Sequence, residues 1–407
     1  MPFMPRQRWA RLLLFVAAWS LTLGAESPLR ADETGMPPVD DLSSLLAESV
    51  KRHKLPGMAA AIVGGGRITA TGAGGVRVRG HQEKITTDDL FHIGSDTKSM
   101  TATLIAILIE EGKLRWNSTP AEVFAGHGIK HIDPAWKKVT LEELLSHHAG
   151  VRPNPDMSTL DSLLIFKPRE QRLRVCRTIL EKPPDHEPGK DFLYSNAGYI
   201  IAGAMAEAVT DQPWEDLMIE RVFKPLGMKH VGFGPPGLSQ KGARPSSSIT
   251  QPWGHEGAGA GMEPGPGADN PPSLGPAGRV HSTLSDWARY ATLHLSAEHP
   301  EANASAGGRP LLPVAQLRHL HTPFGGPIDK SGAKYAMGWA VISRGTPGQI
   351  ELTHAGSNGM WYADISLRMW ENRAILIVTN QGDKAASRAC AEVRRTLVKH
   401  SRSGAGK

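Results

Sequence analysis

The 407-residue sequence has very few cysteines, Cys176 and Cys390 being the only two. They lie far apart in segments with helical spacing, so no disulfide framework organises the fold; a single pairing in an oxidising compartment stays open. No spacing typical of a metal site occurs. His127 and His131 are four residues apart, but the glycines around them argue against the helix that such a pair needs. We therefore expect no metal and no other cofactor.

Neither sign of charge dominates. The formal net charge of +6 comes from 46 basic and 40 acidic residues, and half of it belongs to Arg6, Arg8 and Arg11. Because no clustered basic stripe accompanies this small excess, the composition argues against a nucleic-acid partner. A small-molecule or peptide substrate is the expected partner, and the oligomeric state is not indicated.

No apolar run reaches the roughly 20 residues that span a bilayer comfortably. Residues 12–23 are apolar, follow the three arginines and precede Gly24 and Ala25, which is the pattern of a signal peptide. No nearby cysteine suggests a lipoprotein, and no paired arginines suggest twin-arginine export. We predict a signal peptide at residues 1–25, a folded unit at 26–400 and a tail at 401–407. Export to a bacterial periplasm or beyond, without stable membrane insertion after cleavage, follows; a retained anchor is the alternative.

The candidate chemistry begins at Ser95. Behind it, residues 102–112 form an apolar run of about three helical turns, closed by Gly112, which predicts a buried helix. At the N-terminal end of such a helix, unpaired N–H groups and the dipole favour negative charge. Lys98 lies three residues on and shares a face with Ser95. A lysine in a dry pocket can act as the base that activates a serine, so the two residues form a candidate nucleophile–base pair.

The spacing alone is weak evidence. Ser331 and Lys334 repeat it in a glycine-rich stretch without an apolar helix behind them, and we interpret that copy as chance. A plain capping serine is the structural alternative for Ser95 itself.

Apolar periodicity outlines the fold. The early part predicts a helix at 39–54 and strands at 58–63 and 68–71, with 76–78 continuing the sheet. Helical spacing then dominates, at 141–146, 171–180, 197–210, 214–222 and 285–295. Strand patterns return at 337–343, 350–354, 361–369 and 374–379, before a closing helix at 384–399.

This order predicts an α/β fold of the α+β kind. Two early and four late strands would form one antiparallel sheet built from both chain ends, flanked by the terminal helices. The sheet part covers about residues 39–94 and 325–400, and an inserted, mainly helical domain covers about 95–324.

Three further motifs accompany Ser95-Asp96-Thr97-Lys98. Tyr194-Ser195-Asn196 precedes a helix, His354-Ala355-Gly356-Ser357 ends a predicted strand, and residues 144–151 (LLSHHAGV) close a helix. In this order and spacing they resemble the serine β-lactamase and penicillin-recognising superfamily, on its class C side. That branch includes D-Ala-D-Ala carboxypeptidases, D-aminopeptidases and β-lactamase-like esterases. The absence of a Gly-x-Ser-x-Gly elbow disfavours an α/β-hydrolase.

The resemblance implies a role for each motif. Ser95 would be the acylated nucleophile, and Lys98 and Tyr194 would share the proton transfers; which of them is the base at each step stays open. Asn196 would bind the substrate's amide or acyl side chain. The backbone N–H groups of Ser95 and Ser357, beside Gly356, would form the oxyanion hole. His147 and His148 are interpreted as structural.

One position departs from the class C β-lactamase pattern. A Lys-Thr-Gly strand is expected there, whereas this chain has His354-Ala355-Gly356, a variant that resembles the family's peptidases and esterases. Histidine, with an ordinary pKa of about 6.5, is mostly uncharged near neutral pH, so His354 would hold a substrate carboxylate weakly. We therefore expect short esters to react readily and β-lactams poorly, unless Arg279 or another cation replaces the missing charge.

The sequence thus predicts an exported serine hydrolase acting on esters, amides or β-lactams through an acyl-serine intermediate. The alternatives are a non-hydrolytic penicillin-binding or sensor protein and a true β-lactamase or D-Ala-D-Ala carboxypeptidase. The presence of Ser95, Lys98, Tyr194 and Asn196 together favours an enzyme, because a binder does not need all four.

Overall fold

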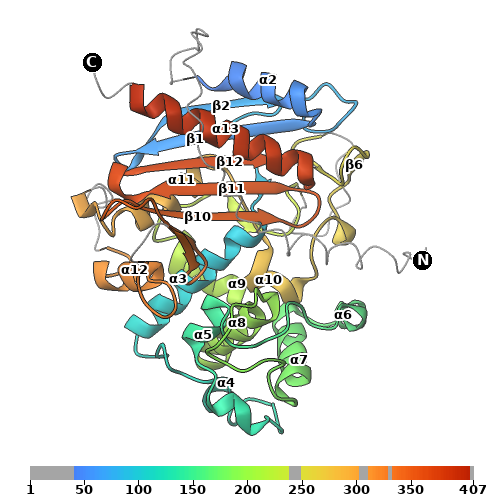
Figure 1. The fold of residues 1–407 in the computed structure, drawn as a ribbon. Coiled ribbons are helices and arrows are strands. Elements are labelled where there is room, and N and C mark those ends of the chain that lie inside the picture. Colours follow the sequence, from blue (N-terminus) through green and yellow to red (C-terminus); the bar gives the residue numbers. More distant parts are fainter. Residues whose placement is uncertain (1–40, 238–248, 302–309, 329–331, 404–407) are drawn as a thin grey trace.

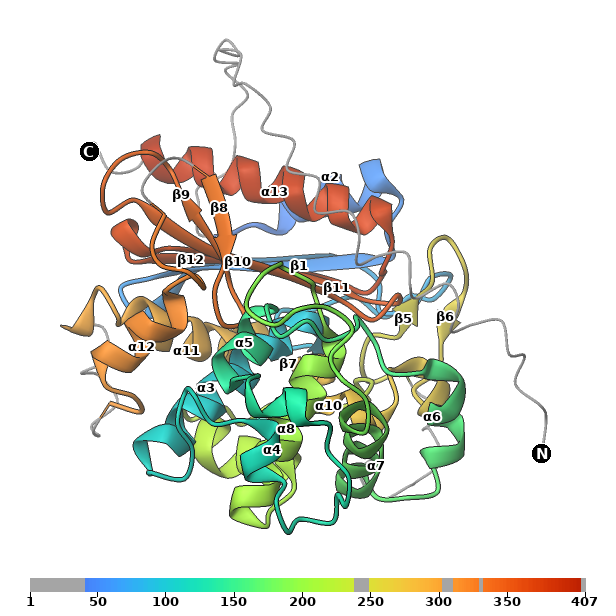
Figure 2. The ribbon, with the colours of Figure 1, turned by 60° about the horizontal axis from the view of Figure 1, so that its bottom comes forward.

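The computed structural model describes residues 41–237, 249–301, 310–328 and 332–403. An antiparallel sheet with helices on both faces lies beside a mainly helical part (Figure 1; Figure 2). The predicted signal peptide and Ser331 lie outside the described residues. Within the described ranges, no helix is both long and apolar enough to cross a bilayer.

The large sheet is built from both ends of the chain, as predicted. Its strand order is β2-β1-β12-β11-β10-β9-β8, and β1 pairs with β12 so that Met58 lies opposite Thr379. The strands are β1 (Gly57–Gly64), β2 (Arg67–Gly75), β8 (Gly332–Tyr335), β9 (Ala340–Ser343), β10 (Ile350–Ser357), β11 (Tyr362–Arg368) and β12 (Arg373–Thr379).

Two details of the predicted sheet were wrong. The late part contributes a fifth strand, β8. Only one of its four residues, Tyr335, is buried, so the strand shows no apolar alternation by which the sequence could predict it. Residues 76–78 do not continue the sheet. Val76 forms an isolated bridge with Lys84 instead, because the chain turns away after Gly75.

Alternating side chains of the sheet form two hydrophobic cores. On β1, Met58, Ala60 and Ile62 face one side, while Ala59, Ala61 and Val63 face the other. The first side is covered by the terminal helices α2 (Ser43–His53) and α13 (Lys384–Ser403), and the second by the helical part (Figure 2). The sheet is therefore the middle layer of three.

The helix α3 (Thr97–Glu110) lies in the centre of the molecule. Every residue from Thr97 to Leu108 is buried, because sheet, helices and loops surround the helix. The apolar run that begins at residue 102 predicts this burial. The other helices of the helical part are α4 (Pro120–Val123), α5 (Leu141–Ser146), α6 (Met157–Leu163), α7 (Pro168–Leu180), α8 (Asn196–Thr210), α9 (Trp214–Leu217), α10 (Gly275–Gly278), α11 (Leu284–Leu295) and α12 (Val314–His321).

Irregular elements complete this part. The single helix predicted at 214–222 divides into α9 and a π-helix, Met218–Phe223. Short strands form a second sheet of β3 (Phe91–His92), β7 (Val280–Ser282) and β4 (Val231–Phe233), and a hairpin of β5 (Gly254–His255) and β6 (Gly261–Met262). These strands were not predicted, since segments of two or three residues carry no periodicity.

Both cysteines are buried free thiols, Cys176 in α7 and Cys390 in α13. Burial raises the pKa of each thiol, so neither is poised to react. The disulfide that the sequence left open is not formed.

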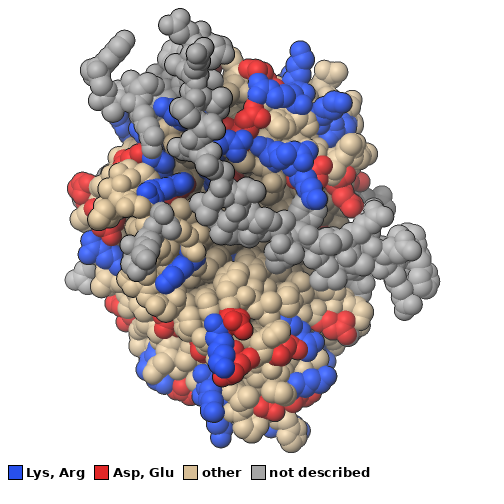
Figure 3. Space-filling view, in the orientation of Figure 1, with Lys and Arg blue, Asp and Glu red and all other residues tan. Residues whose placement is uncertain are grey.

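The surface carries both signs of charge. Figure 3 shows acidic and basic side chains intermixed over the helical part. Between the terminal helices, Arg52 of α2 forms ion pairs with Glu48 and with Glu392 of α13. Exposed pairs of this kind contribute little stability.

A buried charge cluster joins three helices. Arg172 of α7 is fully buried and donates to Glu207 of α8 at 3.1 Å and to Glu215 of α9 at 2.9 Å. It also donates to the carbonyl of Pro272, close to α10, at 3.1 Å. Because both carboxylates depend on one guanidinium, its loss would leave the buried Glu207 and the partly buried Glu215 without their counter-ion.

We expect Arg172→Ala to lower the free energy of unfolding by about 3–5 kcal/mol. The matched control is Arg318→Ala, since Arg318 pairs with Glu298 on the surface and should cost less than about 1 kcal/mol. Urea denaturation followed by circular dichroism measures both. Equal losses would show that the cluster does not hold the helices together.

Candidate active site

Ser95 lies in a short 3-10 turn, Gly94–Asp96, between β3 and α3. The turn is tied to the helix because the Thr97 hydroxyl donates to the carbonyl of Gly94 at 2.6 Å. The same hydroxyl accepts the N–H of Val280 at 3.1 Å, which fixes the turn against β7. Ser95 therefore sits on a rigid support directly before the buried helix.

Lys98 is completely buried and its amine has three oxygen partners. Nζ lies 3.1 Å from Ser95 Oγ, 2.7 Å from Asn196 Oδ1 and 2.7 Å from the carbonyl of Ala277. Burial lowers the pKa of Lys98 well below its ordinary value, and a negative charge on Asp96 would act in the opposite direction. Two of the predicted site residues, Ser95 and Asn196, thus meet at this amine.

Tyr194 lies over the same amine, with its ring centroid 4.8 Å from Lys98 Nζ. Burial raises the pKa of Tyr194, although a hydrogen bond with the Ser95 hydroxyl lowers it in part. Asn196 begins α8, and Ser195 caps that helix by accepting the N–H of Gly198 at 2.9 Å. The cap holds the extended segment from which Tyr194 projects.

The loop after α5 supports Tyr194 and Asn196 from behind. His147 takes a left-handed conformation (φ 67°) and accepts the N–H of Ser195 on Nδ1 at 3.0 Å. Its ring lies 4.3 Å from that of Tyr194, between centroids. The amide of Asn196 donates to Asn154 Oδ1 at 2.8 Å. These contacts are consistent with the structural role predicted for His147.

Two glycines let β10 touch the turn that carries Ser95. A Cβ atom at Gly356 would stand 1.9 Å from the carbonyl oxygen of Ile93 and 2.7 Å from the nitrogen of Ser95. One at Gly94, whose φ is +53°, would stand 2.3 Å from the nitrogen of Ser357. Only residues without side chains permit this approach, which brings the backbone nitrogens of Ser95 and Ser357 to one place.

His354 lies behind the site and is almost completely buried. Nδ1 is 3.2 Å from Asp96 Oδ1, and Nε2 is 3.0 Å from the Tyr335 hydroxyl. Burial lowers the pKa of His354 to about 3, and a positive charge on Lys98 would act in the same direction. Arg279 does not replace a missing charge freely, because its Nε is paired with buried Asp269 at 3.1 Å.

Several supporting residues escaped sequence analysis. Asp269 accepts from Asn358 at 3.0 Å and from the N–H of Asn270 at 2.7 Å, which anchors the turn after Ser357. Asp96 and Tyr335 contact His354, although neither was predicted as a site residue. Asp96 lies inside the Ser95–Lys98 motif, and that position could have indicated a role in the site. Tyr335 and Asp269 lie outside every motif, so the sequence contained no indication of their role.

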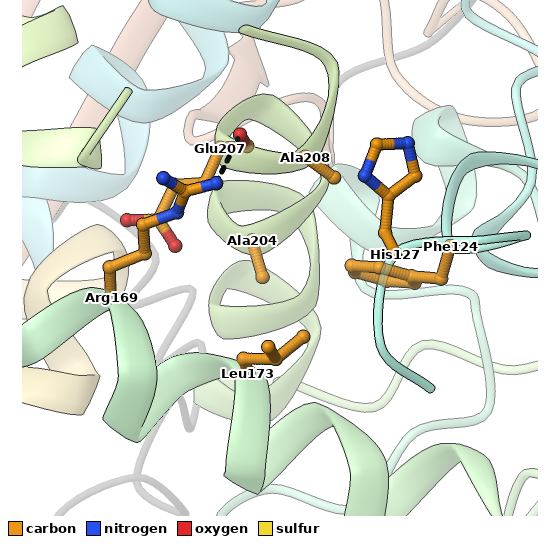
Figure 4. Close-up of a pocket in the computed structure, with 7 residues that line it drawn as sticks. All are labelled: Phe124, His127, Arg169, Leu173, Ala204, Glu207 and Ala208. Atoms are coloured by element: carbon orange, nitrogen blue, oxygen red, sulfur yellow. Dashed lines mark hydrogen bonds between the residues drawn. The ribbon is translucent and has the colours of Figure 1, made fainter. Parts of the chain in front are cut away.

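A separate hollow of about 210 Å³ lies in the helical part (Figure 4). Arg169, on its wall, donates to the carbonyl oxygens of Glu207 and Asp211 at the end of α8. Its guanidinium is also paired with the Asp211 carboxylate. The lining contains no predicted site residue: Phe124, His127, Arg169, Leu173, Ala204, Glu207 and Ala208. Across the described part of the chain, no group of three His, Cys, Asp or Glu residues is arranged to hold a metal ion.

Three proteins with related sequences carry names that refer to penicillin binding or to hydrolysis. A penicillin-binding protein 4 from Amycolatopsis lactamdurans is 29% identical over 338 residues, covering 81% of this chain and 82% of that protein. The D-alanyl-D-alanine-carboxypeptidase/endopeptidase AmpH of Escherichia coli (strain K12) is 24% identical and covers 75% of each chain. Unguisins hydrolase ungD' of Aspergillus campestris (strain IBT 28561) is 25% identical over 76% of this chain, which spans only 56% of that hydrolase.

Solved structures show the same fold. The octameric penicillin-binding protein homologue from Pyrococcus abyssi aligns with a TM-score of 0.67 at 21% identity, covering 88% of this chain and 76% of that chain. SurE aligns with a TM-score of 0.68 at 22% identity, covering 88% and 74%. The family model described as Beta-lactamase matches residues 42–398, which include both halves of the sheet and every predicted site residue. The chain therefore belongs to the beta-lactamase family.

Proposed function

We propose that the protein is an exported serine hydrolase that forms an acyl intermediate on Ser95 and acts on esters, amides or β-lactams. The observation that carries this proposal is the buried amine of Lys98, 3.1 Å from the Ser95 hydroxyl. Relatives named as hydrolase and carboxypeptidase support a hydrolytic reaction. The N-terminal arginines and the apolar run after them support export.

The partners of Lys98 suit a neutral amine that acts as a base. A neutral amine has two N–H donors and one lone pair. The oxygens of Asn196 and Ala277 can only accept, so they take the two donors, and the lone pair then points at Ser95 Oγ. The lowered pKa of Lys98 favours this state. The serine proton moves to Lys98 while Oγ attacks the substrate carbonyl.

Tyr194 is suited to the leaving group. Because burial raises its pKa, the phenol keeps its proton in the resting site and can donate it. When the scissile bond breaks, Tyr194 protonates the leaving oxygen or nitrogen, and Lys98 returns the serine proton to Tyr194. Water then attacks the acyl-serine with the transfers reversed, which releases the acid and restores Ser95.

The backbone N–H groups of Ser95 and Ser357 would stabilise the oxyanion, as the close approach at Gly94 and Gly356 suggests. Asn196 would bind the acyl side of the substrate. With His354 buried and Arg279 paired, we propose that substrates lacking a carboxylate are preferred and that short acyl esters react faster than β-lactams.

A fluorophosphonate probe tests the function directly. We expect intact-mass analysis to show one adduct on the wild-type protein and none on Ser95→Ala, because the probe needs an activated serine. Ser331→Ala, which changes the second Ser-x-x-Lys copy, should label normally. An adduct on any residue other than Ser95 would contradict the proposal.

Lys98 and Tyr194 should act as one unit. Lys98→Ala and Tyr194→Phe should each lower kcat for 4-nitrophenyl butyrate by at least ~10²-fold, and the double variant should lose far less than the product of the two. Because the base is the neutral amine, wild-type kcat/KM should fall as the pH drops through the pKa of Lys98. Near-wild-type turnover by Lys98→Ala would place the base elsewhere.

The oxyanion site depends on Gly356. Gly356→Ala should lower kcat for the same ester by roughly 10²-fold or more, because the added methyl group would push the Ser95 nitrogen away from β10. Gly332→Ala is the matched control on β8, since a Cβ there meets nothing within 4 Å. Similar kcat values for these two variants would exclude a role for the Gly356 contact.

A further inference from the structure

Asp96 is a buried carboxyl group for which the proposed reaction has no use. It lies between the nucleophile and the base in sequence, and about 1% of its surface is exposed. Oδ1 contacts His354 Nδ1 at 3.2 Å, and no donor among the described residues reaches Oδ2. An ionised carboxylate with so few donors would be very costly in a dry site.

Tyr335 is the partner of the second ring nitrogen of His354. Its hydroxyl lies 3.0 Å from Nε2 and can donate to a bare Nε2 or accept from a protonated one. A neutral His354 can therefore carry its hydrogen on either nitrogen.

Neither tautomer of His354 gives an ionised Asp96 enough donors. Burial lowers the pKa of His354, so the ring is uncharged and has one N–H. With that hydrogen on Nδ1, a carboxylate would accept one hydrogen bond on Oδ1 and none from the described residues on Oδ2; with it on Nε2, the ring would donate nothing to Asp96. A carboxyl group that keeps its proton avoids this cost and donates from Oδ1 to Nδ1, while Nε2–H donates to Tyr335.

The charges around Asp96 agree with a protonated carboxyl. Burial raises the pKa of Asp96 first, and the negative charge of Asp364 on β11 raises it further, while Lys98 acts the other way. Asp364 itself is paired with Arg394 of α13 at 3.1 Å. Tyr335, Tyr194 and Tyr290, which also interact with Asp96, keep their protons because burial raises the pKa of each.

We propose that Asp96 is a specificity-determining residue: it is held as a neutral carboxylic acid that donates to His354, and the pair keeps the rear of the site uncharged. The proposal rests on the proposed function, because it concerns which substrates the Ser95 site accepts. His354 then acts through Asp96 and does not itself hold a substrate carboxylate.

If Asp96 is neutral, introducing lysine at position 354 alone should not restore a positive charge for the substrate. In His354→Lys, the new ammonium group stands beside Asp96, which gives up its proton and neutralises it. The net charge of the pair is unchanged, so a substrate carboxylate gains little. In Asp96→Asn/His354→Lys, the amide cannot ionise, and the ammonium charge remains available to the substrate.

The test compares phenyl butyrate with 3-carboxyphenyl butyrate, which share an acyl group and differ by one carboxylate on the leaving group. The measured quantity is the ratio of kcat/KM for the carboxylated ester to that for the plain ester, so each variant is its own reference. We expect the ratio to rise about tenfold or more in Asp96→Asn/His354→Lys and less than about threefold in either single variant.

Asp364→Asn/His354→Lys is the control, because it removes a neighbouring buried carboxyl whose partner is Arg394 and leaves Asp96 in place. Its ratio should match that of His354→Lys alone. A full rise in His354→Lys alone would overturn the proposal, as would an unchanged ratio in an Asp96→Asn/His354→Lys protein that still hydrolyses phenyl butyrate.

Infrared spectroscopy tests the protonation state without turnover. The difference spectrum of wild type minus Asp96→Asn at neutral pH should contain the C=O stretching band of a protonated carboxylic acid, and a carboxylate band in its place would overturn the proposal. If the wild-type protein neither hydrolyses phenyl butyrate nor reacts with a fluorophosphonate, the proposed function fails, while the infrared result still decides the state of Asp96.

Discussion

The burial of the Lys98 amine is the constraint on which the rest of the site depends. An ammonium group removed from water is costly, so its surroundings must either supply a counter-charge or favour the neutral amine. The described structure surrounds Nζ with three uncharged oxygens, of Ser95, Asn196 and Ala277. Each comes from a different segment, so α3, α8 and α10 must pack together before the amine has its partners.

This requirement explains why the sheet is assembled from both chain ends. Ser95 follows β3 in the first quarter of the chain, whereas Gly356 and Ser357 end β10 near its close. The pairing of β1 with β12 carries the late strands back beside the early segment. The absence of a side chain at Gly356 then permits backbone contact at the site. The position of the turn Gly94–Asp96 therefore depends both on the long-range strand pairing and on the local contact with Gly356.

Sequence patterns predicted the layers and the large elements, because long strands and helices repeat their burial over many residues. The buried α3 and the long helix α8 were readable in this way, but the cap of α8 at Ser195 was not predicted. The short strands β3 to β8 were not, since two to four residues contain no period. The motifs also identified the residues that meet at Lys98. They could not show that His354 faces Asp96 and Tyr335, because that contact joins the turn before α3 to β8 and β10 across the fold.

The same contact changes how the histidine of the His354-Ala355-Gly356 motif is understood. Considered alone, a histidine in place of lysine lowers the charge of a site and leaves a polar ring facing the substrate. Here the ring is nearly buried and both nitrogens have partners, so the residue belongs to the support of the site. Charge at position 354 therefore cannot be assigned from that residue alone. Asp96 lies far from β10 in the sequence. Its carboxyl group decides whether a positive charge introduced at position 354 would remain free.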